Sequence, residues 1–449
     1  MIRTNAMSSP TPNNNLQTVQ LYIKTELAYL SNSFWGIENA NKSLEEFNER
    51  PGNLGDSITF DTTPRFIDYN GLVITQQPSV QRVQTLIASQ AKNIAMGYTD
   101  EQYIFNVKDY MREFGNSAAQ QLGTAIETDI LKNIVSGVVG INPNSSQFGV
   151  AQIHSGPYRF YGDGNTPINS YGQLAQAWAN FVSYGAATHK RRGVLPVNLV
   201  PPIVASGLNQ FAPARNDEIA TSWELGNFTG MDCEWSSSNL LPIHVAGSIG
   251  NAASPNNLMT VVSTNDPTGV NVTAITFTEP TGSTDVNAIK AGDLFQFVDV
   301  AGQPKMRFLT FIGQHVTSLP VQFRATADAV TVAGTVTVQI ETINGVGLVW
   351  ARNQNQNLNN ALAAGMKVRP LPSHQAGWMD AGDAFYLAMP KLPLQSPFDT
   401  VYYRDPESGA GLRHYWGTQF GMDNKAYVRD CVWGSTLVSE DSMRLIFPL

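Results

Sequence analysis

The amino-acid sequence predicts an α+β fold in which strands outnumber helices. Apolar and polar residues alternate around Ile58 and Phe60, which is the period of a strand with two unlike faces. Between Val107 and Ile134 apolar residues instead recur at steps of three and four, as on one face of a helix. Many short strand-like segments then follow from Leu240 to Pro370. With 449 residues, the chain is long enough for roughly two to four domains with cores of their own.

The early strand belongs to a predicted two-stranded ribbon between Asn53 and Gln102. Its strands flank a long tip, residues 67–80, which contains the turn-forming residues Asn70, Gly71 and Pro78. Few apolar residues lie within the tip, so the ribbon lacks a core of its own. Because an isolated two-stranded ribbon is only marginally stable in water, we expect a neighbour to complete it.

Three segments have helical spacing. Residues 16–30 predict about four turns, and residues 107–134 predict about eight turns, or roughly 45 Å at about 1.5 Å per residue. A shorter helix is predicted at 171–184 and is followed by the basic cluster 189–192. A buried strand is expected after the cluster, at 194–200.

The segment from 236 to 369 reads almost wholly as strands and turns. Short strands at near-regular spacing are typical of a small β-barrel. The amide-rich run 353–360 predicts a linker that leaves this barrel. The predicted strands are 270–277, 294–300, 306–311, 321–325 and 331–340.

The chain is poor in charge and acidic overall. Charged residues make up 14%, which is low for a soluble protein, and Ser, Thr, Asn and Gln fill the gap. This composition fits a stable β-rich protein with an uncharged polar surface, or a subunit whose surface is largely covered by other subunits. The net charge of -8 gives no general attraction to phosphate, which disfavours a free nucleic-acid binder.

The two cysteines, Cys233 and Cys431, are too few for a disulfide framework or a metal cluster, so we expect reduced core residues. No segment approaches the ~20 apolar residues of a membrane span, and no signal-peptide core is visible at the N-terminus. We therefore expect no membrane partner and a soluble protein in the cytoplasm of the producing cell.

No motif for enzyme chemistry is found in the sequence. A Walker loop, a zinc-binding HExxH, paired CxxC motifs and a GxSxG nucleophile elbow are all missing. The six histidines are scattered without metal-ligand spacing, and we expect each to have a hydrogen-bonded structural role. The sequence therefore predicts a protein that is not an enzyme, with no cofactor and no metal.

Several segments, taken in order, resemble the N-terminal third of tailed-bacteriophage major capsid proteins. The similarity is greatest to the Salmonella-phage coat type, which has an inserted domain, and covers roughly 1–230 and 370–449. Within the middle of the chain, the run Gly292–Phe297 is similar to the strand that opens the inserted barrel of this type. The segments that carry the resemblance are 16–30, Phe34, Glu45-Glu46-Phe47, the strand from Gly55 to Phe66, and the return strand to Glu101.

The resemblance implies the fold shared by such capsid proteins, the Johnson fold. It assigns 1–48 to an N-terminal arm, 49–98 to an extended loop, and 99–150 to a peripheral domain with a long spine helix. It further assigns 151–235 to the first part of an axial domain, 236–369 to the inserted β-barrel, and 370–449 to the C-terminal part of the axial and peripheral domains.

The resemblance also implies a structural function: self-assembly into the icosahedral shell that encloses the double-stranded DNA of a tailed phage. The implied partners are further copies of the chain in pentamers and hexamers, a scaffolding protein, a portal protein, and packaged DNA bound without sequence specificity. Assembly is expected in the host bacterial cytoplasm and the mature location in the virion capsid.

Two other classes of protein stay open at this stage. A phage tail or fibre protein would also be β-rich, polar and acidic, although the long helix and the early ribbon fit it poorly. A hydrolase with a carbohydrate-binding barrel would explain the Trp and Tyr content, but paired carboxylates at recognisable positions are missing.

Two groups of residues are candidates for contacts with partners. Charged residues of the ribbon cannot all be satisfied within their own subunit and are expected to pair with a neighbour's peripheral domain. The basic cluster predicts either a solvated helix end or a contact with DNA or scaffold. The ribbon residues are Glu49, Arg50, Asp56, Arg65 and Asp68, and the cluster residues are Lys190, Arg191 and Arg192.

Overall fold

The computed structural model divides the chain into two compact units, and both are discontinuous in sequence. Unit 1 contains 1–56, 88–126 and 388–434, and unit 2 contains 57–87, 127–387 and 435–449. Within these ranges the structure describes 35–41, 52, 54–62, 65–69, 71–72, 76–77, 82–99, 117–135, 158–187, 189–208, 226–227, 232–251, 258–279, 285–299, 306–310, 313–341, 346–382, 384–394, 398–404, 411–418, 424–437 and 441–449.

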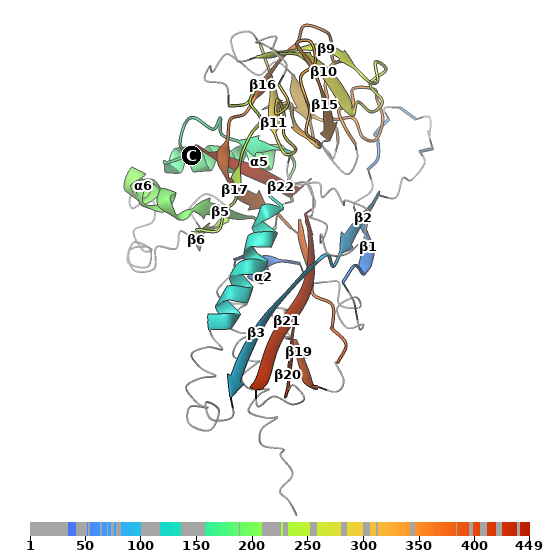
Figure 1. Ribbon diagram of the computed structural model, residues 1–449. Coiled ribbons are helices and arrows are strands. Elements are labelled where there is room, and N and C mark those ends of the chain that lie inside the picture. The colour runs from blue at the N-terminus through green and yellow to red at the C-terminus, as the bar shows by residue number, and fades with distance from the viewer. Residues whose placement is uncertain are drawn as a thin grey trace, which may run out of the picture. The chain divides into compact units, whose positions relative to one another are not determined.

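Unit 1 is built on an antiparallel sheet of long strands (Figure 1). Strand β21 (Asn424–Leu437) lies at its centre, between β20 (Gly411–Thr418) and β3 (Gln90–Thr99), and β19 (Asp399–Arg404) follows β20. The pairing of β3 with β21 is continuous over ten positions, from Gln90 opposite Trp433 to Thr99 opposite Asn424. Strand β18 (Phe385–Ala388) also pairs with β21, whose last residues, 435–437, belong to unit 2.

A cross-strand ion pair stabilises this sheet. Arg413 on β20 lies opposite Asp430 on β21, and its Nε donates to Asp430 Oδ1 over 2.9 Å while Nη2 contacts Oδ2. A bidentate arginine–carboxylate pair is among the stronger polar contacts in proteins. The remaining guanidinium nitrogen donates to the carbonyl of Pro393 over 2.6 Å, so Arg413 joins three segments of the unit.

The helix predicted at 107–134 is described over residues 117–132. The short helix α2 (Trp35–Asn39) belongs to unit 1. Ala118, Leu122, Ile126 and Ile130 are buried, which confirms the predicted apolar face in this part of the helix. The first positions of that face, 107–114, and the predicted helix 16–30 lie outside the described residues. No helix in the ranges given above is long and apolar enough to cross a membrane.

The predicted ribbon is present in unit 2 as β1 (Ser57–Thr62) and β2 (Arg82–Ile87). The two strands are antiparallel, with Ser57 opposite Ile87 and Thr62 opposite Arg82. Each pairs with no other described strand. The chain leaves the ribbon after Ile87, and the following strand β3 pairs with β21 instead of extending the ribbon to Tyr98.

A seven-stranded sheet forms the middle of unit 2. Its order is β4 (Phe160–Tyr161), β22 (Ser442–Phe447), β17 (His374–Asp380), β5 (Arg192–Pro196), β7 (Glu234–Ser238) and β6 (Gly226–Asn227), and β8 (Ile243–His244) also pairs with β17. The C-terminal strand β22 is buried along its whole length, because it runs beside β17 in the interior of the sheet.

Helix α5 (Tyr171–Ser183) confirms the prediction for residues 171–184. The Ser170 hydroxyl accepts a hydrogen bond from the Gln173 amide and so caps its N-terminus, and Leu174, Ala177 and Phe181 form its buried face. The predicted strand 194–200 is shorter than expected, because β5 ends at Pro196 and gives way to the helical turns η1 (Val197–Leu199), α6 (Val200–Ile203) and η2 (Val204–Leu208).

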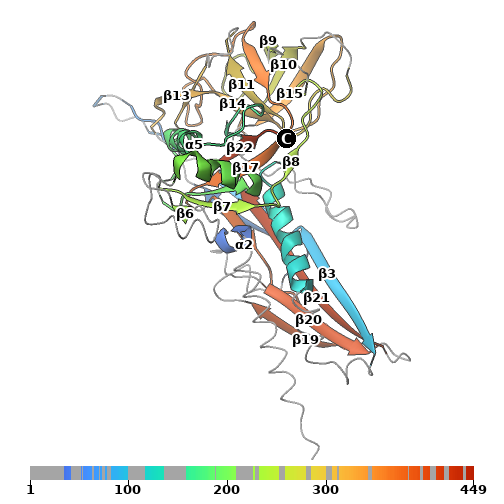
Figure 2. The same cartoon turned by 90° about the vertical axis from the view of Figure 1, so that its left-hand side faces the viewer.

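The predicted barrel is confirmed as a closed, six-stranded β-barrel (Figures 1 and 2). Phe277, Phe295 and Phe323 stack at its centre, with the rings of Phe295 and Phe323 5.1 Å apart. The strand order is β10 (Ala274–Thr278), β15 (Thr335–Glu341), β14 (Gln322–Ala325), β11 (Leu294–Val298), β16 (Lys367–Pro370) and β9 (Met259–Thr264), which pairs back with β10.

The prediction of a linker at 353–360 is wrong. Asn357 is buried and its side chain accepts from the Val349 amide and donates to the Gly347 carbonyl, while Leu358 is bridged to Phe308. The amides of this run therefore satisfy backbone groups inside the domain. Phe308 lies in a separate two-stranded ladder, β12 (Arg307–Leu309) with β13 (Val316–Pro320).

Candidate functional site

The tip of the ribbon exposes several large apolar side chains. Phe66, Tyr69 and Leu72 have exposed fractions of 59%, 46% and 102%. The tip is shaped locally by Gln77, whose amide accepts from the Ile67 N–H over 2.9 Å and donates to the Ile67 carbonyl. The Gln77 side chain thus forms the two hydrogen bonds that a neighbouring strand would form with Ile67, and it holds residues 67 and 77 of the tip together. We call Phe66, Tyr69 and Leu72 the tip patch.

The predicted charged residues of the ribbon lie in different environments. Asp56 and Asp68 are exposed, whereas Glu49 and Arg50 lie outside the described residues. Only 8% of Arg65 is exposed, so its side chain is buried within the chain, and its expected contact with a neighbour stays a prediction. Asp68 accepts a hydrogen bond at its carbonyl from Arg352, whose guanidinium also lies 5.5 Å from the Tyr69 ring centre.

The basic cluster is not a single exposed patch. Lys190 is exposed and has a left-handed backbone (φ 49°), whereas Arg191 and Arg192 are half-buried. Arg191 donates from Nε to the Ala187 carbonyl over 2.9 Å, and Arg192 is the first residue of β5. The predicted solvated helix end is therefore wrong, because α5 ends at Ser183 and the cluster leads into a strand.

Asp380 at the end of β17 is a buried carboxyl group opposite Arg192 in the ladder. Burial raises the pKa of Asp380 to about 7, the Arg192 guanidinium lowers it, and the Asp441 carboxylate raises it. Its Oδ1 has no hydrogen-bond partner among the described residues. The group is therefore positioned to titrate near neutral pH.

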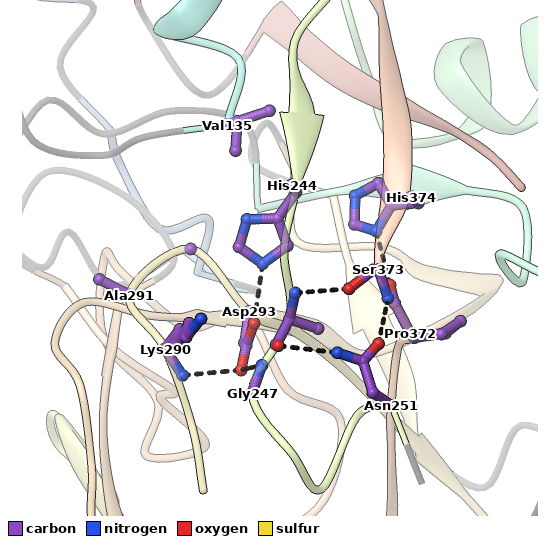
Figure 3. Close-up of polar contacts among 12 residues, drawn as sticks. Val135, His244, Gly247, Asn251, Lys290, Ala291, Asp293, Pro372, Ser373 and His374 are labelled. Carbon is purple, nitrogen blue, oxygen red and sulfur yellow. Dashed lines mark hydrogen bonds and ion pairs between the residues drawn. The ribbon is translucent and has the colours of Figure 1, made fainter. Parts of the chain in front are cut away.

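Two buried histidines lie side by side where the barrel joins the seven-stranded sheet (Figure 3). His244 on β8 is opposite His374 on β17, and the ring centres are 5.3 Å apart. Burial lowers the pKa of both groups, that of His374 to about 3. For both histidines this confirms the expected hydrogen-bonded structural role, since His244 contacts Asp293 and His374 contacts the Pro372 carbonyl. Sequence reasoning did not bring these residues together, because nothing local marks the pairing.

Among the described residues, the two thiols are buried and no metal-ligand cluster is present. Cys233 and Cys431 are both buried and unbridged, as expected, and burial raises the pKa of each thiol, which disfavours the reactive thiolate. In the same ranges, no cluster of three or more His, Cys, Asp or Glu residues could hold a metal ion.

Comparison with known proteins finds similarity only among solved structures. No family model and no curated protein matches the chain. The capsid of Ralstonia phage GP4 matches with 9% identity over 89% of this chain and 86% of that one, at a TM-score of 0.41. Mycobacterium phage Che8 matches with 10% identity over 92% of this chain and 90% of that one, at a TM-score of 0.39. The capsid of Cyanophage P-SCSP1u matches with 8% identity over 89% of this chain and 85% of that one, at a TM-score of 0.37. All three TM-scores lie below 0.5, and no residue of this chain takes a role from these structures.

Proposed function

We propose that this chain is the major capsid protein of a tailed double-stranded DNA phage and that its function is to assemble into a closed shell. The observation that carries this proposal is the ribbon: β1 and β2 pair only with each other among the described strands, and the tip patch is exposed. A two-stranded ribbon with an apolar tip is marginal by itself, and an exposed apolar patch marks a contact surface.

Each of the other sheets and helices can be assigned to one domain of the proposed capsid protein. We assign the ribbon to the extended loop, the β3–β21–β20–β19 sheet with the spine helix to the peripheral domain, the seven-stranded sheet with α5 to the axial domain, and the barrel to the insertion. The extended loop then ends near Ala88 rather than at 98, because β3 pairs within unit 1.

Partner contacts follow from the same assignment. Copies of the chain would meet through the tip patch and the exposed carboxylates Asp56 and Asp68. Scaffolding and portal proteins are expected partners during assembly, and we assign Lys190, the exposed residue of the cluster 190–192, to a contact with scaffold or DNA. The net charge of -8 suits a wall that encloses DNA without binding it tightly.

Assembly with the cognate scaffolding protein tests this function. We expect closed, roughly isometric shells by electron microscopy for the native chain and none for a Phe66→Ser, Leu72→Ser double variant that melts like the native monomer. Val270→Ser, which changes an apolar side chain 54% exposed on the barrel, is the matched control for a loss of surface apolar area. Fibres, or a monomer that persists at high concentration with scaffold, would refute the capsid assignment.

A further inference from the structure

The polypeptide passes between the seven-stranded sheet and the barrel at two places, and each has a buried histidine at its sheet end. The chain leaves the sheet after β8, which ends at His244, and returns to it at β17, which begins at His374. Asp293 directly precedes the barrel strand β11, and Arg444 comes from β22. We call His244, His374, Asp293 and Arg444 the neck cluster, of which Figure 3 shows the two histidines and Asp293.

His244 links the sheet to the barrel through Asp293. Its Nε2 lies 2.7 Å from Asp293 Oδ1, and Asp293 Oδ2 accepts from the amides of Gly247 over 3.1 Å and Lys290 over 2.8 Å. The Asp293 carboxylate therefore contacts a side chain of β8, a backbone amide of the segment after β8, and a backbone amide of a barrel loop. Gly292 lets the barrel loop come close to His244, because its φ is +92° and a Cβ there would lie 3.2 Å from the His244 ring.

The hydrogen bonds of His374 require a neutral ring. Its Nδ1–H donates to the Pro372 carbonyl over 2.8 Å, which leaves Nε2 as an acceptor, and Arg444 Nη1 faces that atom at 3.5 Å. A guanidinium has only donors. A second proton on His374 would therefore direct an N–H at a positively charged donor.

The Asp293 carboxylate favours a proton on His244, but burial and the nearby cations outweigh it and disfavour a positive charge on either imidazole. The groups facing the cluster are the Lys290 ammonium from the barrel loop, the Arg444 guanidinium from β22, and the Arg324 guanidinium of β14, which is paired with Glu341 of β15 at 3.6 Å. His244 and His374 are 4% and 0% exposed, so water cannot stabilise an added proton.

We propose that the neck cluster is a pH-sensitive joint: with both imidazoles neutral it fixes the barrel on the sheet, and protonation of the imidazoles loosens the neck while the barrel strands stay paired. The unfolded or opened rings bind protons near their ordinary pKa of about 6.5, whereas the buried rings resist until lower pH. Proton uptake thus favours the opened neck as pH falls below about 6.5. This inference does not depend on the proposed function.

Hydrogen exchange of the full-length chain near pH 7.5 and near pH 5 tests the joint. After correction for intrinsic rates, we expect the amides of Gly247, Lys290, Ser373 and Ala376 to exchange at least about tenfold faster near pH 5, with β10 and β15 unchanged. In a His244→Gln, His374→Asn variant, whose amides keep a donor but do not titrate, this difference should disappear. His315→Gln, at an exposed histidine outside the neck, should respond like the native chain.

Two results would overturn the proposal. One is an acid response that persists in the double variant, and the other is native exchange at the neck that is equal at the two pH values or rises equally throughout the barrel. Circular dichroism near pH 7.5 establishes that the double variant is folded. If the double variant is not folded, hydrogen exchange of the His374→Asn single variant is compared with that of the native chain. Full retention of the faster exchange near pH 5 in the single variant counts against the joint.

Discussion

The side chain of Gln322 forms two hydrogen bonds with the backbone of Phe160, as a neighbouring strand would. Its Nε2 donates to the Phe160 carbonyl and its Oε1 accepts from the Phe160 amide, both over 2.9 Å. Gln322 begins the barrel strand β14, and Phe160 begins β4 of the seven-stranded sheet. The Tyr184 hydroxyl donates to the same Oε1 over 3.0 Å. One barrel side chain thus satisfies three groups outside the barrel.

Replacement of Gln322 by Ala should therefore lower the stability of the whole chain. The substitution leaves a buried N–H and a buried C=O unsatisfied, for which we expect a loss of about 1–3 kcal/mol in the free energy of unfolding, measured by urea denaturation. Gln339→Ala, at an exposed position on barrel strand β15, should stay within about 0.5 kcal/mol of the native chain. Equal effects of the two substitutions would show that the Phe160 contact is not stabilising.

Asp380 should make the chain less stable as pH rises toward neutral. Because its pKa is about 7 in the folded state and near its ordinary value in the unfolded state, the folded chain binds more protons between about pH 4 and 7, and stability falls across this range. Asp380→Asn should remove this loss, which linkage puts at up to about 4 kcal/mol for a shift of about three pKa units, and so raise the free energy of unfolding near pH 8, with little effect near pH 4. Destabilisation of the variant near pH 8 would instead show that an ionised Asp380 is held by Arg192.

Arg65, just before the ribbon tip, and Asp68, at the start of the tip, should respond differently to charge reversal. Asp68 is exposed, so Asp68→Lys should leave monomer melting within about 0.5 kcal/mol of native while reducing the yield of shells. Arg65 is buried, so Arg65→Glu should destabilise the monomer itself by more than about 1 kcal/mol. Thermal melting and shell yield, measured on both variants, separate the two effects. Normal shells from Asp68→Lys would remove Asp68 from the contact surface.

An excised fragment of residues 236–369 should fold as a barrel but be less stable than the same strands in the full chain. Its ladder is closed and its phenylalanine core is internal, yet the apolar core continues from barrel residue Phe277 to Trp235 of the sheet and Phe181 of α5. Truncation exposes part of that core to water. Far-UV circular dichroism and NMR dispersion measure folding, and a disordered fragment would show that the barrel needs the sheet.

Local periodicity in the sequence determined the secondary structure of several elements. The apolar face of the helix predicted at 107–134, helix α5, the ribbon strands and most barrel strands were predicted, because the burial pattern of each depends on residues a few positions apart. Strands β9, β13 and β16 were not predicted from the sequence.

Only the tertiary structure decided which distant segments meet. The departure of β3 from the ribbon to pair with β21, the burial of Arg65, the packing of Asn357 and the pairing of His244 with His374 all depend on contacts between residues far apart in the chain. A strand edge or a buried charge is stabilised by whichever partner the whole chain brings to it, and the sequence around each residue does not record that partner.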